Sequence, residues 1–179
     1  MSGVAPQAGP GDNQQKLTTE RIADGDISCV RFDGTIDEAF DGKKLASSIK
    51  ARVLILDMGR VAKVSSFGIR EWSEFIKGVE RSVDQIYLIE CTAKVVDQLN
   101  MVANFAGKAK VVSFYGPYRC DFCDIDEDVL FQVDRDSAAI RSFNPPEHLC
   151  GTCARPQFFD EDPASYMATI AQQSQFDLV

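Results

Sequence analysis

The stretch "RVLILDMGRVAKVSSFGIREW", residues 52–72, decides the fold. Its unbroken apolar run, residues 53–56, is typical of a strand that is covered on both faces of a sheet. We expect Asp57 and Gly59 to end this strand. A helix is expected to begin near Phe67, because the apolar residues that follow recur at helical spacing. This apolar stripe consists of Ile69, Trp72, Phe75, Ile76 and Val79.

The alternation of strands and helices extends outward from this stretch in both directions. Further strands are predicted within residues 16–25, 27–36, 85–91 and 109–118, and further helices near Phe40 and Ala93. Thr35 and Glu38 form a capping-box pattern before the first helix, and Gly107 is placed to stop the last one. The last helix has a buried stripe that consists of Val95, Val96, Leu99, Val102 and Ala103. Strands joined by such helices imply right-handed crossovers, so the sequence predicts an α/β fold with a mixed, largely parallel sheet.

Composition narrows the classes of function. The chain has 179 residues, 45% of them hydrophobic, and a formal net charge of −8. Such a chain can bury a core of its own, and its acidity argues against a nucleic-acid footprint or an anionic membrane surface. The sequence contains no apolar run near the ~20 residues that a membrane span needs. Residues 1–16 are predicted to be a disordered leader rather than a signal peptide, and the expected compartment is the cytoplasm.

Residues 118–156, "YRCDFCDIDEDVLFQVDRDSAAIRSFNPPEHLCGTCARP", contain two Cys-x₂-Cys pairs. Cys120 and Cys123 precede Cys150 and Cys153 by a gap of 26 residues (150 − 123 − 1). Four thiolates on two tight turns can occupy the corners of a tetrahedron, which predicts a closed, structural zinc site. Apolar and polar residues alternate in 128–134, as in a short hairpin strand. The combination resembles a zinc ribbon, a small β module that metal holds together.

Other interpretations of the cysteines remain open. Two disulfides are disfavoured in the cytosol, and a thioredoxin-like redox pair needs a helix start that "DFCDIDEDV" does not provide. An iron–sulfur cluster also uses four cysteines. His148, the only histidine, is expected to be a loop residue and not a fifth ligand. Cys29 and Cys91 are expected to be small buried residues.

The order of elements resembles the STAS domain, the family of bacterial anti-sigma-factor antagonists and stressosome subunits. The resemblance rests on "VRFDGTID" (residues 30–37), "RVLILDMGRVAKVSSFGIREW" (52–72) and "IYLIECTAKVVDQL" (86–99). It covers about residues 17–117. The chain is thereby divided into a leader (1–16), a STAS-like domain (17–117), a zinc-ribbon-like module (118–156) and a polar tail with a short helix (157–179). In the tail, Asp162 is a cap candidate, Pro163 suits the first helical position, and the apolar stripe consists of Tyr166, Met167 and Ile170.

The resemblance also implies a regulatory serine. Partner-switching members of the family carry Asp-Ser-Ser-Gly before this helix, and an anti-sigma-type kinase phosphorylates the first serine. The corresponding residues here are Ser65, Ser66, Phe67 and Gly68, which places Ser66 at the phosphorylated position. Ser65 replaces the aspartate and Phe67 the second serine. A serine at a helix start also caps free backbone N–H groups, and either Ser65 or Ser66 could do so.

The sequence therefore favours a non-catalytic regulatory or scaffold protein that binds a protein partner through the STAS-like domain. An anti-sigma-type kinase is the partner that the resemblance implies. A zinc-ribbon factor associated with nucleic acid and a thiol or redox protein are the alternatives. An enzyme is disfavoured because we find no phosphate-binding loop and no nucleophile with a paired histidine. The sequence leaves open whether the chain forms a homo-oligomer.

Overall fold

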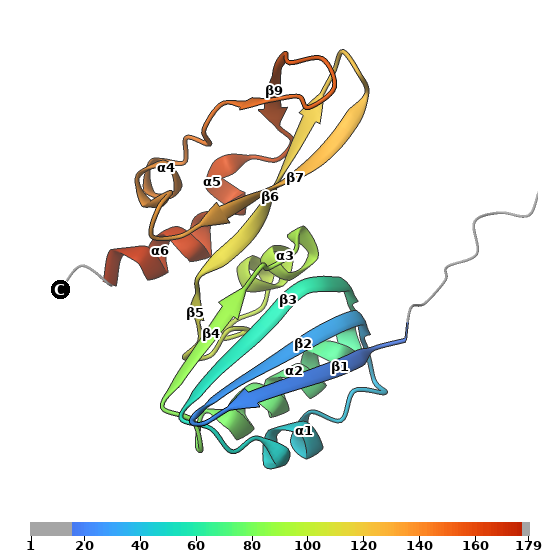
Figure 1. Ribbon diagram of the computed structural model, residues 1–179, viewed down its shortest axis with the longest axis vertical. Helices are drawn as coiled ribbons and strands as arrows, with labels where there is room; N and C mark the ends of the chain where they lie inside the picture. The colour runs from blue at the N-terminus through green and yellow to red at the C-terminus, as the bar shows by residue number, and fades with distance from the viewer. Residues whose placement is uncertain (1–15, 177–179) are drawn as a thin grey trace, which may run out of the picture.

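The computed structural model describes residues 16–176, so the predicted leader lies outside it except for Lys16. The described chain forms two β-sheets and six helices (Figure 1). The first sheet has the order β1-β2-β3-β4-β5. Its strands are β1 Thr18–Asp24, β2 Ile27–Ile36, β3 Val53–Val64, β4 Gln85–Ile89 and β5 Lys110–Val111. Only β1 runs antiparallel to its neighbour, which confirms a mixed α/β architecture with a largely parallel first sheet.

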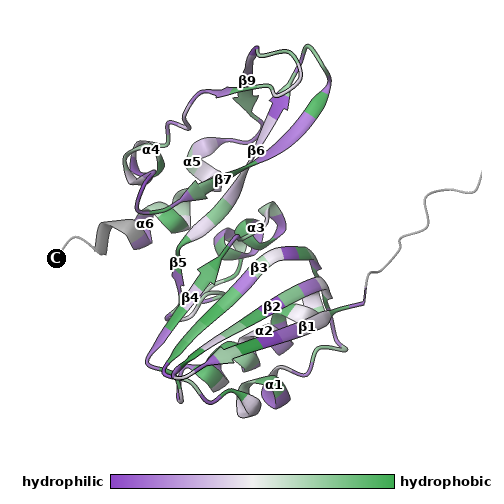
Figure 2. Ribbon diagram, viewed as in Figure 1, coloured by the Kyte–Doolittle hydropathy of each residue, from purple (hydrophilic) through white to green (hydrophobic). Residues whose placement is uncertain are grey.

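Three helices connect the strands of the first sheet. They are α1 Gly42–Ser48, α2 Ser66–Val79 and α3 Ala93–Met101. Helices α1 and α2 lie side by side on one face of the sheet, while α3 lies at its upper edge, toward the second sheet (Figure 1). Figure 2 shows the apolar residues concentrated in β3, β4 and the helix surfaces that face the sheet. The amphipathic stripes of the sequence therefore face a common core.

Trp72 lies at the centre of this core. Its side chain is fully buried, its indole Nε1–H donates to the carbonyl oxygen of Phe105 at 2.8 Å, and its ring stacks on the Phe105 ring at 5.3 Å. The rings of Phe32 and Phe75 contact it at 5.5 and 5.4 Å. Leu99 is also buried. The predicted core assignment is confirmed at both Trp72 and Leu99.

The third strand is longer than the sequence predicts. The prediction that Asp57 and Gly59 end it is wrong, because β3 continues to Val64 and stays paired with β2. β3 has one extra residue opposite the step from Arg31 to Asp33 in β2, and another opposite the step from Gly34 to Thr35. These two bulges bend the pair and let it continue. Such bulges have no signal in hydrophobic periodicity.

Two predicted helix boundaries are also wrong. Thr35 does not cap α1, because it lies within β2. The N-cap of α1 is Asp41, whose carboxylate accepts a hydrogen bond from the backbone N–H of Lys44 at 2.9 Å. Gly107 does not end α3, which stops at Met101 because Val102 adopts an extended backbone. Of the stripe on the last helix, Val102 and Ala103 therefore fall outside α3.

The second sheet has the order β7-β6-β9-β8. Its strands are β6 Ser113–Cys120, β7 Ile125–Gln132, β8 His148–Leu149 and β9 Pro156–Phe159. The predicted strand 109–118 is thus divided between the two sheets, and the predicted hairpin strand 128–134 begins three residues earlier, as β7. The remaining helices are α4 Ser137–Ser142, α5 Pro163–Tyr166 and α6 Ala168–Phe176.

The C-terminal helices pack on the second sheet. The Asp162 carboxylate caps α5 by accepting the Ser165 N–H at 2.9 Å, as predicted. The Tyr166 O–H donates to the carbonyl oxygen of Tyr115 in β6. Met167 and Ile170 are fully buried. The apolar stripe of the tail therefore docks on its own chain.

We predict that Trp72→Ala lowers the free energy of unfolding by about 3–5 kcal/mol, because it empties a packed aromatic site. Phe67→Ala is the matched control, since that ring is 70% exposed and its loss should change stability by less than about 0.5 kcal/mol. Urea unfolding followed by circular dichroism gives both values. Equal midpoints for Trp72→Ala and the wild type would contradict the core assignment.

Candidate metal centre

Two β-turns bring the four cysteines together. Cys120 ends β6 and Cys123 lies in the turn to β7; Cys150 follows β8 and Cys153 lies in the turn to β9. The pairings Cys120–Ile125 and Leu149–Pro156 close the two hairpins on either side. All four Sγ atoms lie within 4.8 Å of one another. The predicted meeting of two cysteine pairs that are distant in sequence is confirmed.

The spacing of the sulfurs fits a tetrahedral metal ion. The Sγ atoms of Cys120 and Cys153 are 3.6 Å apart, and those of Cys123 and Cys150 are 4.0 Å apart. A tetrahedron with metal–sulfur bonds of ~2.3 Å has sulfur–sulfur edges of about 3.8 Å. A disulfide requires about 2.05 Å, and all six cysteines are free thiols. The four cysteines can therefore hold a metal ion in a site closed to substrate.

The backbone of the second turn favours a thiolate at Cys150. The N–H groups of Cys153 and Thr152 point to its sulfur and lower the pKa of this thiol to about 6. The pKa of Cys123 is raised to about 12, first by its hydrogen bond with Cys153 and then by burial. Four thiols this close together cannot all be ionised in the absence of a cation, because their negative charges repel one another. A divalent cation would remove the conflict because it attracts every thiolate.

His148 lies in β8, so the prediction of a loop residue is wrong. Its ring packs on Tyr118 at 5.4 Å, and its Nε2 atom is 3.3 Å from a carboxylate oxygen of Glu127. Gln157 donates to the other oxygen of Glu127 at 3.2 Å. His148 is not part of the four-sulfur group, and these neighbours give it a place in the sheet next to the metal centre.

The two remaining cysteines lie apart from the metal centre. Cys91 is completely buried where the two sheets meet, and burial raises the pKa of its thiol far above the ordinary range. Cys29 lies in β2 and is only partly buried. The predicted role as a small buried residue is confirmed for Cys91 and only in part for Cys29.

The start of α2 separates the roles of the two serines. Ser65 is the N-cap, and its hydroxyl accepts the backbone N–H of Gly68 at 3.0 Å. Gly68 packs so tightly that a Cβ there would lie 2.0 Å from the carbonyl oxygen of Ile36. Ser66 is the first helical residue and is exposed, next to the exposed ring of Phe67. The helix therefore uses Ser65 as its cap and leaves the hydroxyl of Ser66 on the surface.

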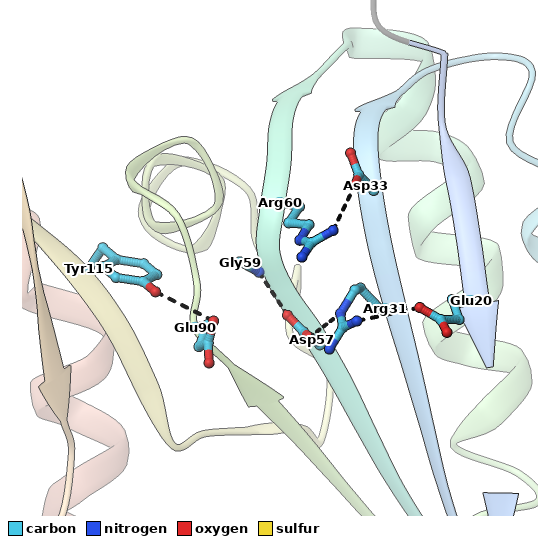
Figure 3. Close-up of polar contacts among 8 residues, drawn as sticks. All are labelled: Glu20, Arg31, Asp33, Asp57, Gly59, Arg60, Glu90 and Tyr115. Carbon is cyan, nitrogen blue, oxygen red and sulfur yellow. Dashed lines mark hydrogen bonds and ion pairs between the residues drawn. The ribbon is translucent and has the colours of Figure 1, made fainter. Parts of the chain in front are cut away.

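Sequence reasoning missed a set of polar contacts, one group around Asp57 within the first sheet and one between Glu90 and Tyr115 of β6 (Figure 3). The buried Asp57 carboxylate accepts from the Arg31 guanidinium at 2.8 Å and from the Gly59 N–H at 3.0 Å. Glu90, at the end of β4, accepts from the Tyr115 O–H at 3.4 Å. A Cβ on residue 59 would lie 2.7 Å from a carboxylate oxygen of Glu90. Asp57 and Gly59 were the sequence signal for these contacts. From the hydrophobic pattern alone, we interpreted them as the residues that end the strand.

No protein-family model matches this sequence, and no curated protein is similar to it. Within residues 16–176, no helix combines the length and apolar character that crossing a lipid bilayer requires. The four-sulfur group is therefore the feature with the most specific chemistry in the described chain.

We predict that the purified protein binds one metal ion per chain and that Cys150→Ser abolishes this binding. Cys29→Ser is the matched control, because it removes a thiol outside the group and should leave the stoichiometry at one. Since protons compete with metal for the thiolates, release should increase as the pH falls. Elemental analysis and a colorimetric metal-release titration give these results. Full metal content in Cys150→Ser would contradict the site.

We predict that Ser65→Ala and Ser66→Ala differ in stability. Loss of the Ser65 cap should cost about 1 kcal/mol, whereas Ser66→Ala should be nearly neutral because its hydroxyl caps no N–H group in the structure. Thermal unfolding of the two variants measures the difference. Equal destabilisation by both changes would show that the two serines share the cap.

Proposed function

We propose that this chain is a non-catalytic regulatory or scaffold protein that binds a protein partner through the start of α2. The observation that carries the proposal is the surface formed by Ser66 and Phe67. Phe67 is 70% exposed although it is large and apolar, and its neighbour Ser66 is free of the capping role that Ser65 fulfils. An exposed aromatic ring beside an uncommitted hydroxyl favours a binding surface with a modifiable centre.

Phosphorylation of Ser66 would change this surface in a defined way. A phosphoserine adds a charge of about −1.5 to −2 and is favoured at a helix N-terminus. That charge would oppose the docking of an apolar partner surface on Phe67. The STAS-like order of the first-sheet elements supports a kinase of the anti-sigma type as both the modifying enzyme and the partner, acting in the cytoplasm.

In this proposal the metal is zinc and has a structural role. The two turns supply four thiolates and leave no ligand position for a substrate, as in closed zinc sites. The ion would hold the ends of the two hairpins and keep the second sheet rigid beside the first. A nucleic-acid role is the weaker alternative, because residues 113–176 carry four arginines against 11 Asp and Glu, a net charge of 4 − 11 = −7.

The test is the affinity of a partner kinase, purified with this chain from its native host, for surface variants. We expect Ser66→Asp to weaken binding by about ten-fold or more through added charge, and Ser66→Ala to preserve it. Phe67→Ala should weaken binding, whereas Met101→Ala, which truncates a side chain exposed to 71% on α3, should not. Calorimetric titration measures these affinities. If Phe67→Ala binds as tightly as Met101→Ala, the α2 surface is not the binding site.

A further inference from the structure

The outer strand of the second sheet has a free edge. β7 is the first strand in the order β7-β6-β9-β8, so β6 is its only neighbour in that sheet. The β6–β7 hairpin extends to the end of the molecule farthest from the first sheet (Figure 1). Its eight pairs run from Ser113–Gln132 to Cys120–Ile125 without a register shift. Proteins usually protect such an edge with proline, a bulge or charge. At its end near α4, β7 already has partners, because the Gln132 N–H donates to Asp136 and the Leu130 carbonyl oxygen accepts from Arg135. The remaining part, residues 125–129, is protected by charge.

The charge on this edge is negative and belongs to one face. Asp126 and Asp128 alternate along β7 with Ile125, Glu127 and Val129, so the two aspartates share a face. Both are exposed. Arg119, on β6, holds Asp126 and Asp124 in ion pairs, but this one cation faces three carboxylates on that side of the hairpin. An excess of negative charge therefore remains along the edge.

The opposite face of β7 is partly apolar. Ile125 is 37% exposed and Val129 is half-buried. Glu127, between them, is engaged by Gln157. A strand added beside β7 would therefore meet Asp126 and Asp128 on one face, and on the other Ile125 and Val129 with the engaged Glu127 between them. The matching sequence alternates basic residues with β-branched apolar residues.

A second copy of this chain does not fit the edge when the acidic residues of the two strands lie side by side. Antiparallel pairing of two β7 strands about Glu127 would place Asp126 opposite Asp128, and parallel pairing would place each aspartate beside itself. Like charges in such positions destabilise a sheet. The other long edge strand, β1, would not select a partner strand by charge in the same way. Its Glu20 already pairs with Arg31, and its Arg21 already donates to the carbonyl oxygen of Ser48.

We propose that β7 docks an extended segment of a protein partner in which lysine or arginine alternates with β-branched apolar residues. The segment extends the second sheet by one strand. Main-chain hydrogen bonds supply affinity, and the carboxylates of Asp126 and Asp128 select the basic side chains. This surface is on a different sheet from Ser66 and Phe67, so the inference goes beyond the function proposed above.

The experiment uses a fluorescein-labelled nonapeptide of alternating lysine and valine, titrated with the full chain and followed by fluorescence anisotropy. Asp126→Asn with Asp128→Asn should raise the Kd about five- to ten-fold, because two cross-strand charge pairs are lost. Glu147→Gln with Glu161→Gln is the matched control. It removes the same charge from exposed positions near β8 and β9 and should change the Kd less than two-fold.

Backbone pairing is tested separately with two N-methylated forms of the peptide. One form is methylated on the odd residues and the other on the even residues, so their charges are identical. Only one set of amides can face β7, so one form should lose binding and the other should retain it.

Two results would overturn the proposal. In the first, the two double variants weaken binding equally and both methylated peptides bind, which would indicate unspecific charge attraction. In the second, sedimentation shows that the wild-type chain is a dimer and that Asp126→Asn with Asp128→Asn strengthens it, which would make a second copy the occupant. Since the peptide is synthetic and α2 is unchanged, failure here leaves the proposed partner site at Phe67 standing.

Discussion

Both sheets depend on the short segment 111–115, where the chain leaves the first sheet and begins the second. The Val112 N–H donates to the carbonyl oxygen of Leu88, and the Val112 carbonyl accepts from Val133. Further along the same segment, the Cys91 N–H donates to the carbonyl oxygen of Ser113, and the Tyr115 N–H donates to the carbonyl oxygen of Cys91. A backbone ladder in a buried setting is costly to break. The second sheet is thereby fixed to the ends of β4 and β5.

This junction imposes a cost on Glu90. Its backbone adopts a left-handed conformation with φ 53°, which costs a non-glycine residue about 1–3 kcal/mol. The Ser113 hydroxyl offsets part of this cost by accepting the Glu90 N–H at 2.8 Å. The Glu90 side chain lies against Tyr115 and over Gly59, where the absence of a side chain leaves room for its carboxylate (Figure 3). The contact between Glu90 and Tyr115 therefore follows from the way in which the two sheets are joined.

Aromatic packing stabilises the second sheet, and a metal ion at the four cysteines would add to it. The sequence favoured a module with too small a core to fold without metal. In the structure, the rings of Phe114, Phe131 and Tyr118 stack in one cluster, and Phe159 and Tyr166 close it from β9 and α5. This cluster is continuous with the core of the first sheet. A metal ion would therefore act on the two turns, while the aromatic rings hold the strands.

The sequence by itself determined most of the local elements and the four cysteines that could hold a metal ion. Apolar stripes identified α2 and α3, and the β-branched content of residues 27–36 identified β2. The spacing of Cys120, Cys123, Cys150 and Cys153 identified the four-sulfur group. Residue type, periodicity and ligand spacing are local properties, so they can be read from the sequence. Tertiary structure alone decided the length of β3, the division of residues 109–118 between two sheets, and the cap at Ser65. Each of these depends on a partner distant in sequence: the β2 strand that pairs with the bulged β3, the β4–β6 junction, or the approach of Gly68 to Ile36. Hydrophobic pattern records which face of a segment is buried, but not which neighbour buries it.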